Sequence, residues 1–140
     1  MEQFLDHSFW GKNGDRQNAL TQIIFAFEDD DIPVSRKDAV LAKLSCLIDY
    51  HSSDEVASLV FAVGKYSSPY SVKVLLSLTH KIINDAIAWQ YLVAYENIVG
   101  NSILPEFGVA FDIIRLFTDE VYFESDKIKQ ALQRFKDYEQ

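Results

Sequence analysis

The chain contains little that could cross-link it or anchor it in a membrane. It has one cysteine among 140 residues, and a single cysteine cannot form an internal disulfide, so Cys46 between Leu44 and Leu47 is interpreted as a packing residue. No uncharged apolar run reaches the roughly 18 residues that a membrane-spanning helix needs. The first residues include early acids and lack a basic segment followed by an apolar core, which argues against a secretory signal. A cytoplasmic location is therefore expected.

Basic residues are also scarce. Lysine and arginine number 13 against 21 acidic residues, which gives a net charge of −8. A surface of this sign repels phosphate groups, so direct binding to nucleic acid or to an anionic membrane is not expected. An acidic excess attracts basic proteins and accelerates their association, although acidity for solubility alone explains the same composition.

Sequence motifs of known catalytic and metal centres are missing as well. There is no Gly-x-Ser-x-Gly elbow and no glycine-rich phosphate loop. The three histidines, His7, His51 and His80, are far apart and form no zinc motif. The aspartates at 29–31 lack the spacing of an EF-hand, so they are interpreted as a solvated loop. We therefore expect no enzymatic activity, no cofactor and no bound metal.

The apolar pattern predicts an all-α protein. Hydrophobic residues make up 49% of the chain and charged residues 24%, which is typical of a globular domain. No segment alternates like a strand over more than about five residues, and the nearest, 119–123, is expected to be a loop or a short helical turn. A turn is predicted at 11–14, and about seven helices follow. Their predicted first residues or caps are Asp15, Ser35, Ser52, Ser68 with Pro69, Asn84, Pro105 and Ser125.

One of these helix starts carries a specific capping signal. Ser52 followed by Glu55 fits a capping box, in which the hydroxyl accepts the amide proton of Glu55 and the carboxylate reaches back to the amide of Ser52. The helix that it opens is expected to extend to about Tyr66. Leu75 and Leu92, on the apolar faces of the following helices, are predicted core residues.

A phrase that occurs twice is the most informative feature of the chain. An acid at Asp54 leads through an apolar run to Gly64, and an acid at Asp85 leads through a second run to Gly100. The step of about 31 residues from Asp54 to Asp85 lies within the range that indicates stacked helix pairs. It favours a short α-solenoid with an extended binding face, in which segments 35–66 and 69–99 are superposable repeats.

The phrase resembles the second helix of a HEAT-like repeat, in which an acid precedes the helix and Ala-Leu-Gly-Lys-Ile-Gly-(Asp/Ser)-Pro closes it. Residues 62–69 read Ala-Val-Gly-Lys-Tyr-Ser-Ser-Pro, and 94–100 look like the next copy. The chain departs from the pattern at Ala57 and Ala88, where the family has arginine. The resemblance implies antiparallel helix pairs in one domain, 1–140, with an N-terminal segment and helix at 1–34, repeats at 35–117 and a capping helix at 118–140.

Size and charge, with the phrases around Ser52 and Pro69, also resemble HEAT-like immunity proteins of bacterial polymorphic or contact-dependent toxin systems. That resemblance implies an inhibitor that is a monomer on its own and that occludes the active site of a cognate basic toxin domain, with a nuclease as the favoured class. A scaffold or regulatory adaptor in a bacterial complex is the alternative.

Aromatic and acidic residues on the repeated helices are the candidate contacts for such a partner, because aromatic residues are enriched in interface hot spots. Trp89 and Tyr91 are two residues apart, about 200° around a helix, so one of them should be exposed. Tyr91 is the predicted exposed anchor. The candidate partner-binding residues are Asp54, Glu55, Tyr66, Tyr70, Asp85, Trp89, Tyr91, Tyr95 and Glu96.

Overall fold

The computed structural model describes residues 15–100, 102, 104–118 and 125–138. Over these residues the chain is helical and contains no strand, which confirms the predicted all-α class. The turn expected at 11–14 and the segment 119–123 lie outside the described residues. The described α-helices are α2 (Asp15–Glu28), α3 (Val34–Leu47), α4 (Ser53–Val63), α5 (Pro69–Ser77), α6 (Asp85–Val99), α7 (Gly108–Thr118) and α8 (Ser125–Tyr138), with short 3₁₀ helices η2 (Thr79–Lys81) and η3 (Pro105–Phe107).

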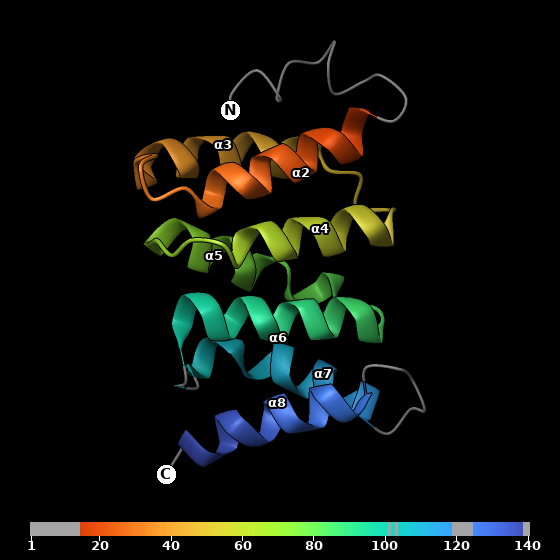
Figure 1. Ribbon diagram of the computed structural model, residues 1–140. Helices are drawn as coiled ribbons and strands as arrows, with labels where there is room; N and C mark the ends of the chain where they lie inside the picture. The colour runs from red at the N-terminus through yellow and green to blue at the C-terminus, as the bar shows by residue number, and fades with distance from the viewer. Residues whose placement is uncertain (1–14, 101, 103, 119–124, 139–140) are drawn as a thin grey trace.

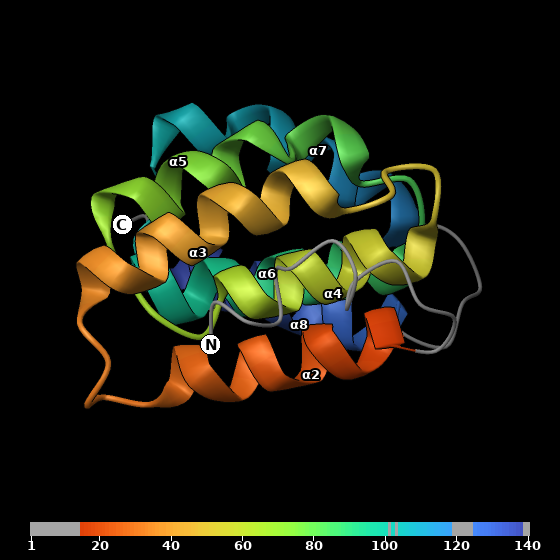
Figure 2. The ribbon, with the colours of Figure 1, turned by 90° about the horizontal axis from the view of Figure 1, so that it is seen from above.

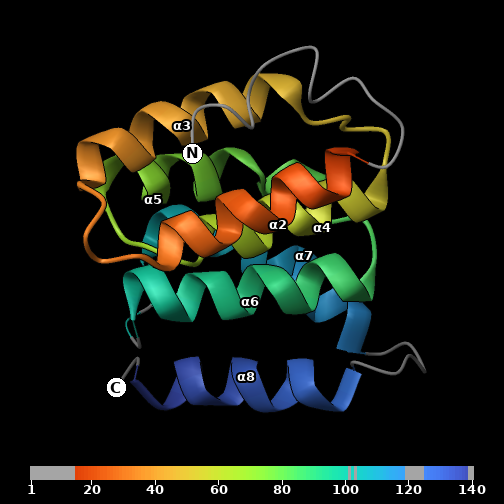
Figure 3. The ribbon, with the colours of Figure 1, turned by 45° about the horizontal axis from the view of Figure 1, so that its top comes forward.

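The helices form two layers. Helices α2, α4, α6 and α8 lie side by side in one layer, and α3, α5 and α7 lie in the other (Figures 1 and 2). The chain alternates between the layers, so the four helices of the first layer run in the same direction and begin at the same end of the molecule (Figures 1 and 3). The most extensive contact joins α4 to α6. The main contacts join helices that are neighbours or next neighbours in the sequence.

The cap of α4 is only half of the predicted capping box. The Ser52 hydroxyl accepts the backbone N–H of Glu55 at 3.3 Å, as predicted. The Glu55 carboxylate, however, accepts the N–H of Asp49 at 3.1 Å and two bonds from the Arg16 guanidinium on α2. The reciprocal bond to Ser52 is therefore a wrong prediction, because an arginine distant in sequence draws the carboxylate away. The helix also ends at Val63, three residues before the expected end at Tyr66.

The cap of α5 confirms the prediction for Ser68 and Pro69. The Ser68 hydroxyl accepts the N–H of Ser71 at 2.9 Å, and the Ser71 hydroxyl accepts the N–H of Ser68 at 2.8 Å. Pro69 occupies the first turn, where its missing N–H is no loss. The Ser68 hydroxyl also donates to Asp38 of α3 at 2.7 Å, and Tyr66 donates to the same oxygen at 2.8 Å. These bonds join the α4–α5 turn to α3.

The two glycines of the repeated phrase have different roles. Gly64 has φ −75°, and a Cβ there would lie 2.8 Å from the Cα of Ala94. Gly100 has φ 93°, a conformation that favours glycine, and ends α6. Both glycines therefore stand at a helix C-terminus, but the close contact between α4 and α6 requires glycine at 64, whereas the backbone conformation favours it at 100.

The core extends through the interface between the layers. Leu75 and Leu92, predicted to be internal, have 0% and 1% of their surface exposed. The Tyr95 ring meets three phenylalanine rings at centroid distances of 4.8–5.1 Å, all edge to face. Those rings, from η3, α7 and α8, are Phe107, Phe111 and Phe135.

Candidate protein-binding surface

An acidic rim, defined here as Asp54, Asp85 and Asp126, lies at the common starting end of the first layer. The three residues occupy the first turns of the successive helices α4, α6 and α8. Asp54 and Asp126 are exposed and Asp85 is half-buried. Carboxylates are stabilised at helix N-termini by the helix dipole, so the rim has a structural role whether or not it binds a partner.

Trp89 lies next to this rim. It follows Asp85 by four residues, which places both side chains on the same face of α6. Its ring is half-buried and lies 5.7 Å from the ammonium of Lys127 on α8. An aromatic ring that keeps part of its surface exposed beside carboxylates offers both a packing surface and charge to a protein partner.

Two other predicted acidic contacts are engaged within the protein. Glu55 of α4 pairs with Arg16 of α2 at 2.5 Å, and Glu96 of α6 pairs with Arg134 of α8 at 2.6 Å. Each carboxylate therefore bridges neighbouring helices of the first layer. A partner could use either one only in competition with its arginine.

The structure corrects the prediction that Tyr91 is the exposed anchor. Tyr91 has 1% of its surface exposed, and its hydroxyl donates to the carbonyl of Leu75 at 2.8 Å and lies 3.1 Å from the hydroxyl of Thr79. Burial raises the pKa of this phenol above its ordinary value. Of the pair, Trp89 is the more exposed residue, because the α6 face that carries Tyr91 packs against α5.

Two more predicted tyrosines are buried and cannot contact a partner in this conformation. Tyr95 is fully buried, and its hydroxyl donates to the carbonyl of Ser102 and accepts the N–H of Leu104, both at 2.8 Å. Tyr66 is buried against Phe27, with a ring centroid distance of 5.0 Å. Tyr70 is half-buried, but it lies on α5 in the other layer, away from the acidic rim.

Among the described residues, those weighed for metal or catalytic chemistry form no cluster. His51 and the aspartates at 29–31 are exposed at turns, and His7 lies outside the described residues. Over the described ranges, no group of three histidine, cysteine or carboxylate side chains is placed to hold a metal ion. None of the helices described combines the length and the apolar character needed to cross a membrane.

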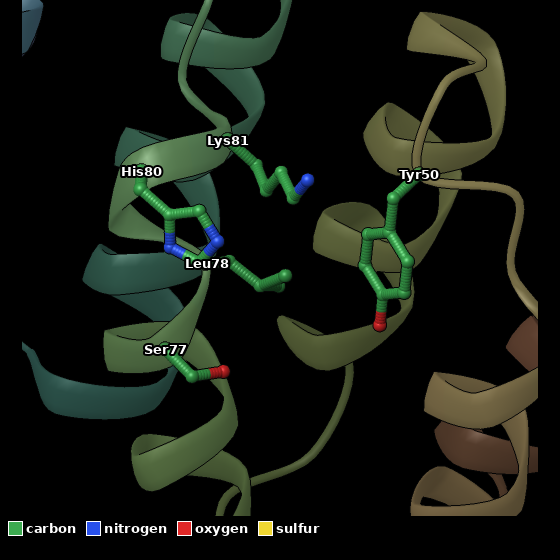
Figure 4. A pocket seen from close by; sticks show the side chains of 5 residues that line it. All are labelled: Tyr50, Ser77, Leu78, His80 and Lys81. Atoms are coloured by element: carbon green, nitrogen blue, oxygen red, sulfur yellow. The ribbon is translucent and has the colours of Figure 1, made fainter.

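Sequence reasoning missed a pocket of about 320 Å³ between the α3–α4 turn and the end of α5 (Figure 4). Its lining consists of Tyr50, Ser77, Leu78, His80 and Lys81. The Lys81 side chain extends toward Tyr50, and its ammonium lies 5.2 Å from the ring centroid (Figure 4). The sequence feature that could have indicated this pocket is segment 69–83, which contains Lys73, His80 and Lys81 but no acidic residue.

Comparison of the chain with protein-family models, with curated proteins and with solved structures gave no match.

Proposed function

We propose that the protein is an immunity protein of HEAT-like type that binds a cognate basic toxin domain, with a nuclease as the favoured class, and neutralises it by covering its active site. The observation that carries the proposal is the half-buried Trp89 beside the acidic rim, on a chain of net charge −8. Carboxylates on three neighbouring helices attract a basic surface and accelerate encounter, and the Trp89 ring supplies apolar contact after encounter.

The partner can be found by affinity purification of the tagged chain from its host, with the product of the adjacent gene as the first candidate. Binding kinetics would then be measured for Asp54→Lys, Asp85→Lys and Trp89→Ala. We expect the aspartate variants to slow association, with a larger effect at low salt, because screening acts over about 10 Å at 0.1 M. We expect Trp89→Ala mainly to speed dissociation.

Asp112→Lys is the matched control, because Asp112 is an exposed acid on α7 in the other layer. It makes the same charge change away from the rim and should leave association near the wild-type rate. Equal slowing by Asp112→Lys would assign the effect to net charge and exclude the rim. Asp54 and Asp85 also stabilise the starts of their own helices by roughly 0.3–1 kcal/mol each. The thermal unfolding of every variant must therefore be compared with that of the wild type.

An activity assay on the captured partner distinguishes the two candidate functions. Loss of the partner's toxic activity when the chain is added in equimolar amount supports an immunity role. A stable complex in which the partner keeps full activity supports the adaptor instead.

A further inference from the structure

Helices α3 and α5 of the second layer carry charge of the sign opposite to that of the rim. Helices α3 and α5 with η2 contain five lysine and arginine residues and one carboxylate, within a chain of net charge −8. That carboxylate, Asp38, accepts the hydroxyl protons of Tyr66 and Ser68 and so faces the α4–α5 turn. Lys37 is buried, and the cations that remain at least partly exposed are Arg36, Lys43, Lys73 and Lys81.

The pocket at Tyr50 and Lys81 lies at the edge of this basic layer (Figure 4). The Tyr50 hydroxyl donates to the carbonyl of Ser45 at 2.7 Å, and the Ser77 hydroxyl donates to the carbonyl of Val74 at 2.6 Å. Both hydroxyl protons are therefore used within the protein. The side chains that can donate to a ligand are Lys81 and His80, so the pocket favours an anionic group.

The remaining walls suit a side chain with an apolar stem. Leu78 is buried and lines the pocket, and the Tyr50 ring lies on the opposite side (Figure 4). A volume of about 320 Å³ is at the lower end of the range for ligand sites. Asp49, next to Tyr50 in the α3–α4 turn, accepts the backbone N–H of His51 at 2.9 Å, and Glu55, which accepts the N–H of Asp49, is paired with Arg16.

We propose that the α3–α5 side binds an acidic polypeptide segment and that the pocket receives one of its side chains, with the terminal carboxylate held by Lys81 and His80. Charge complementarity selects this occupant: the exposed cations of α3 and α5 provide further contacts for acids along the segment. A polypeptide fits better than a nucleic acid, because Leu78 and the Tyr50 ring suit a side chain that has an apolar stem and ends in a carboxylate. Tyr50 and Lys81 each precede a rim aspartate, Asp54 and Asp85, by four residues, so the pocket lies at the same end of the molecule as the acidic rim, whereas the exposed cations of α3 and α5 lie in the other layer.

The test uses the full chain and a fluorescent peptide of about a dozen residues that contains glutamate, leucine and phenylalanine and no basic residue. Binding is measured by fluorescence anisotropy at low and at physiological salt. Lys73→Glu and Lys81→Glu should each weaken binding by about tenfold. Ser77→Phe, which fills the pocket without changing the charge, should weaken it by a similar factor.

Lys129→Glu is the matched control, because Lys129 is exposed on α8 in the first layer. It should change the affinity by less than about twofold. An equal loss in this control overturns the proposal, as does binding that Ser77→Phe leaves unchanged. Tighter binding of an oligothymidine of equal charge would assign the surface to nucleic acid. A concentration-dependent doubling of mass in light scattering, with no peptide bound, would assign it to a second copy of the chain. Either result would also overturn the proposal. None of these outcomes depends on the basic partner of the acidic rim.

Discussion

At the scale of single residues, the closest helix contact depends on an absent side chain. Gly64 ends α4 directly against Ala94 of α6, the pair of helices with the most extensive contact. Its backbone is in the ordinary right-handed helical region, so backbone conformation does not require glycine here. The requirement comes from the space, because a methyl group would overlap backbone atoms of a helix that many other contacts hold in place.

Gly64→Ala should therefore destabilise the protein by about 1–3 kcal/mol, the usual cost of overpacking a close contact. Gly108→Ala is the control, because a Cβ at Gly108 meets nothing within 4 Å and its φ of −54° suits alanine. Urea denaturation should show a lower midpoint for the first variant and an equal or higher midpoint for the second. Equal midpoints would show that α6 moves away from the added methyl group at little cost.

At the scale of elements, ion pairs join the first two helices of the first layer near both of their ends. Arg16 and Glu55 join the starts of α2 and α4, while Glu28 and Lys65 pair at 3.0 Å near their ends. Between α4 and α6 the contact is the close packing at Gly64, and the buried leucines on α5 and α6 face the interior between the layers.

The buried leucines allow a direct test of the two-layer core. Leu75→Ala on α5 and Leu92→Ala on α6 should each lower the free energy of unfolding by about 2–5 kcal/mol, through lost burial and the cavity that remains. Leu116→Ala on α7 is the control, because Leu116 has 67% of its surface exposed and should change stability by less than about 0.5 kcal/mol. A denaturation midpoint that stays unchanged in Leu75→Ala or Leu92→Ala would contradict the assignment of these residues to the core.

The sequence predicted the helices better than it predicted the surface. Local signals sufficed at Ser68, Pro69 and Asn84, because a helix start depends on bonds within four residues. They failed at Glu55, whose arginine partner lies 39 residues away, and at Tyr91, whose buried hydroxyl bonds to Leu75 on another helix. Helical spacing places Trp89 and Tyr91 on different faces, but only the packing of the layers decides which face is internal.

At the scale of the whole molecule, buried phenols make stability depend on alkaline pH. Burial is the main cause of a raised pKa at Tyr50, Tyr66, Tyr91 and Tyr95. In the unfolded chain these phenols ionise near pH 10, whereas in the folded protein they keep their protons to higher pH. Their contribution is complete below about pH 10 and is lost as the pH rises above it, because the unfolded state then releases protons that the folded state retains.

Urea midpoints should therefore be flat from about pH 8 to pH 9 and should fall progressively above about pH 10. Tyr91→Phe removes one of these phenols, so its midpoint, lower at neutral pH, should fall less steeply in the alkaline range. A wild-type midpoint that does not change up to about pH 11 would show that the phenols ionise alike in the two states.

The main contacts between neighbouring and next-neighbouring helices also bear on how the chain folds as it is made. Pairing elements so close in sequence costs little loop-closure entropy, so the protein should have a low contact order and fold within milliseconds. A ribosome adds roughly 5–20 residues per second, which is far slower. Helices α2 to α6 can therefore pack on one another while α8 is still inside the ribosome, leaving the rings of Tyr95 and Phe111 to be covered last, when Phe135 arrives.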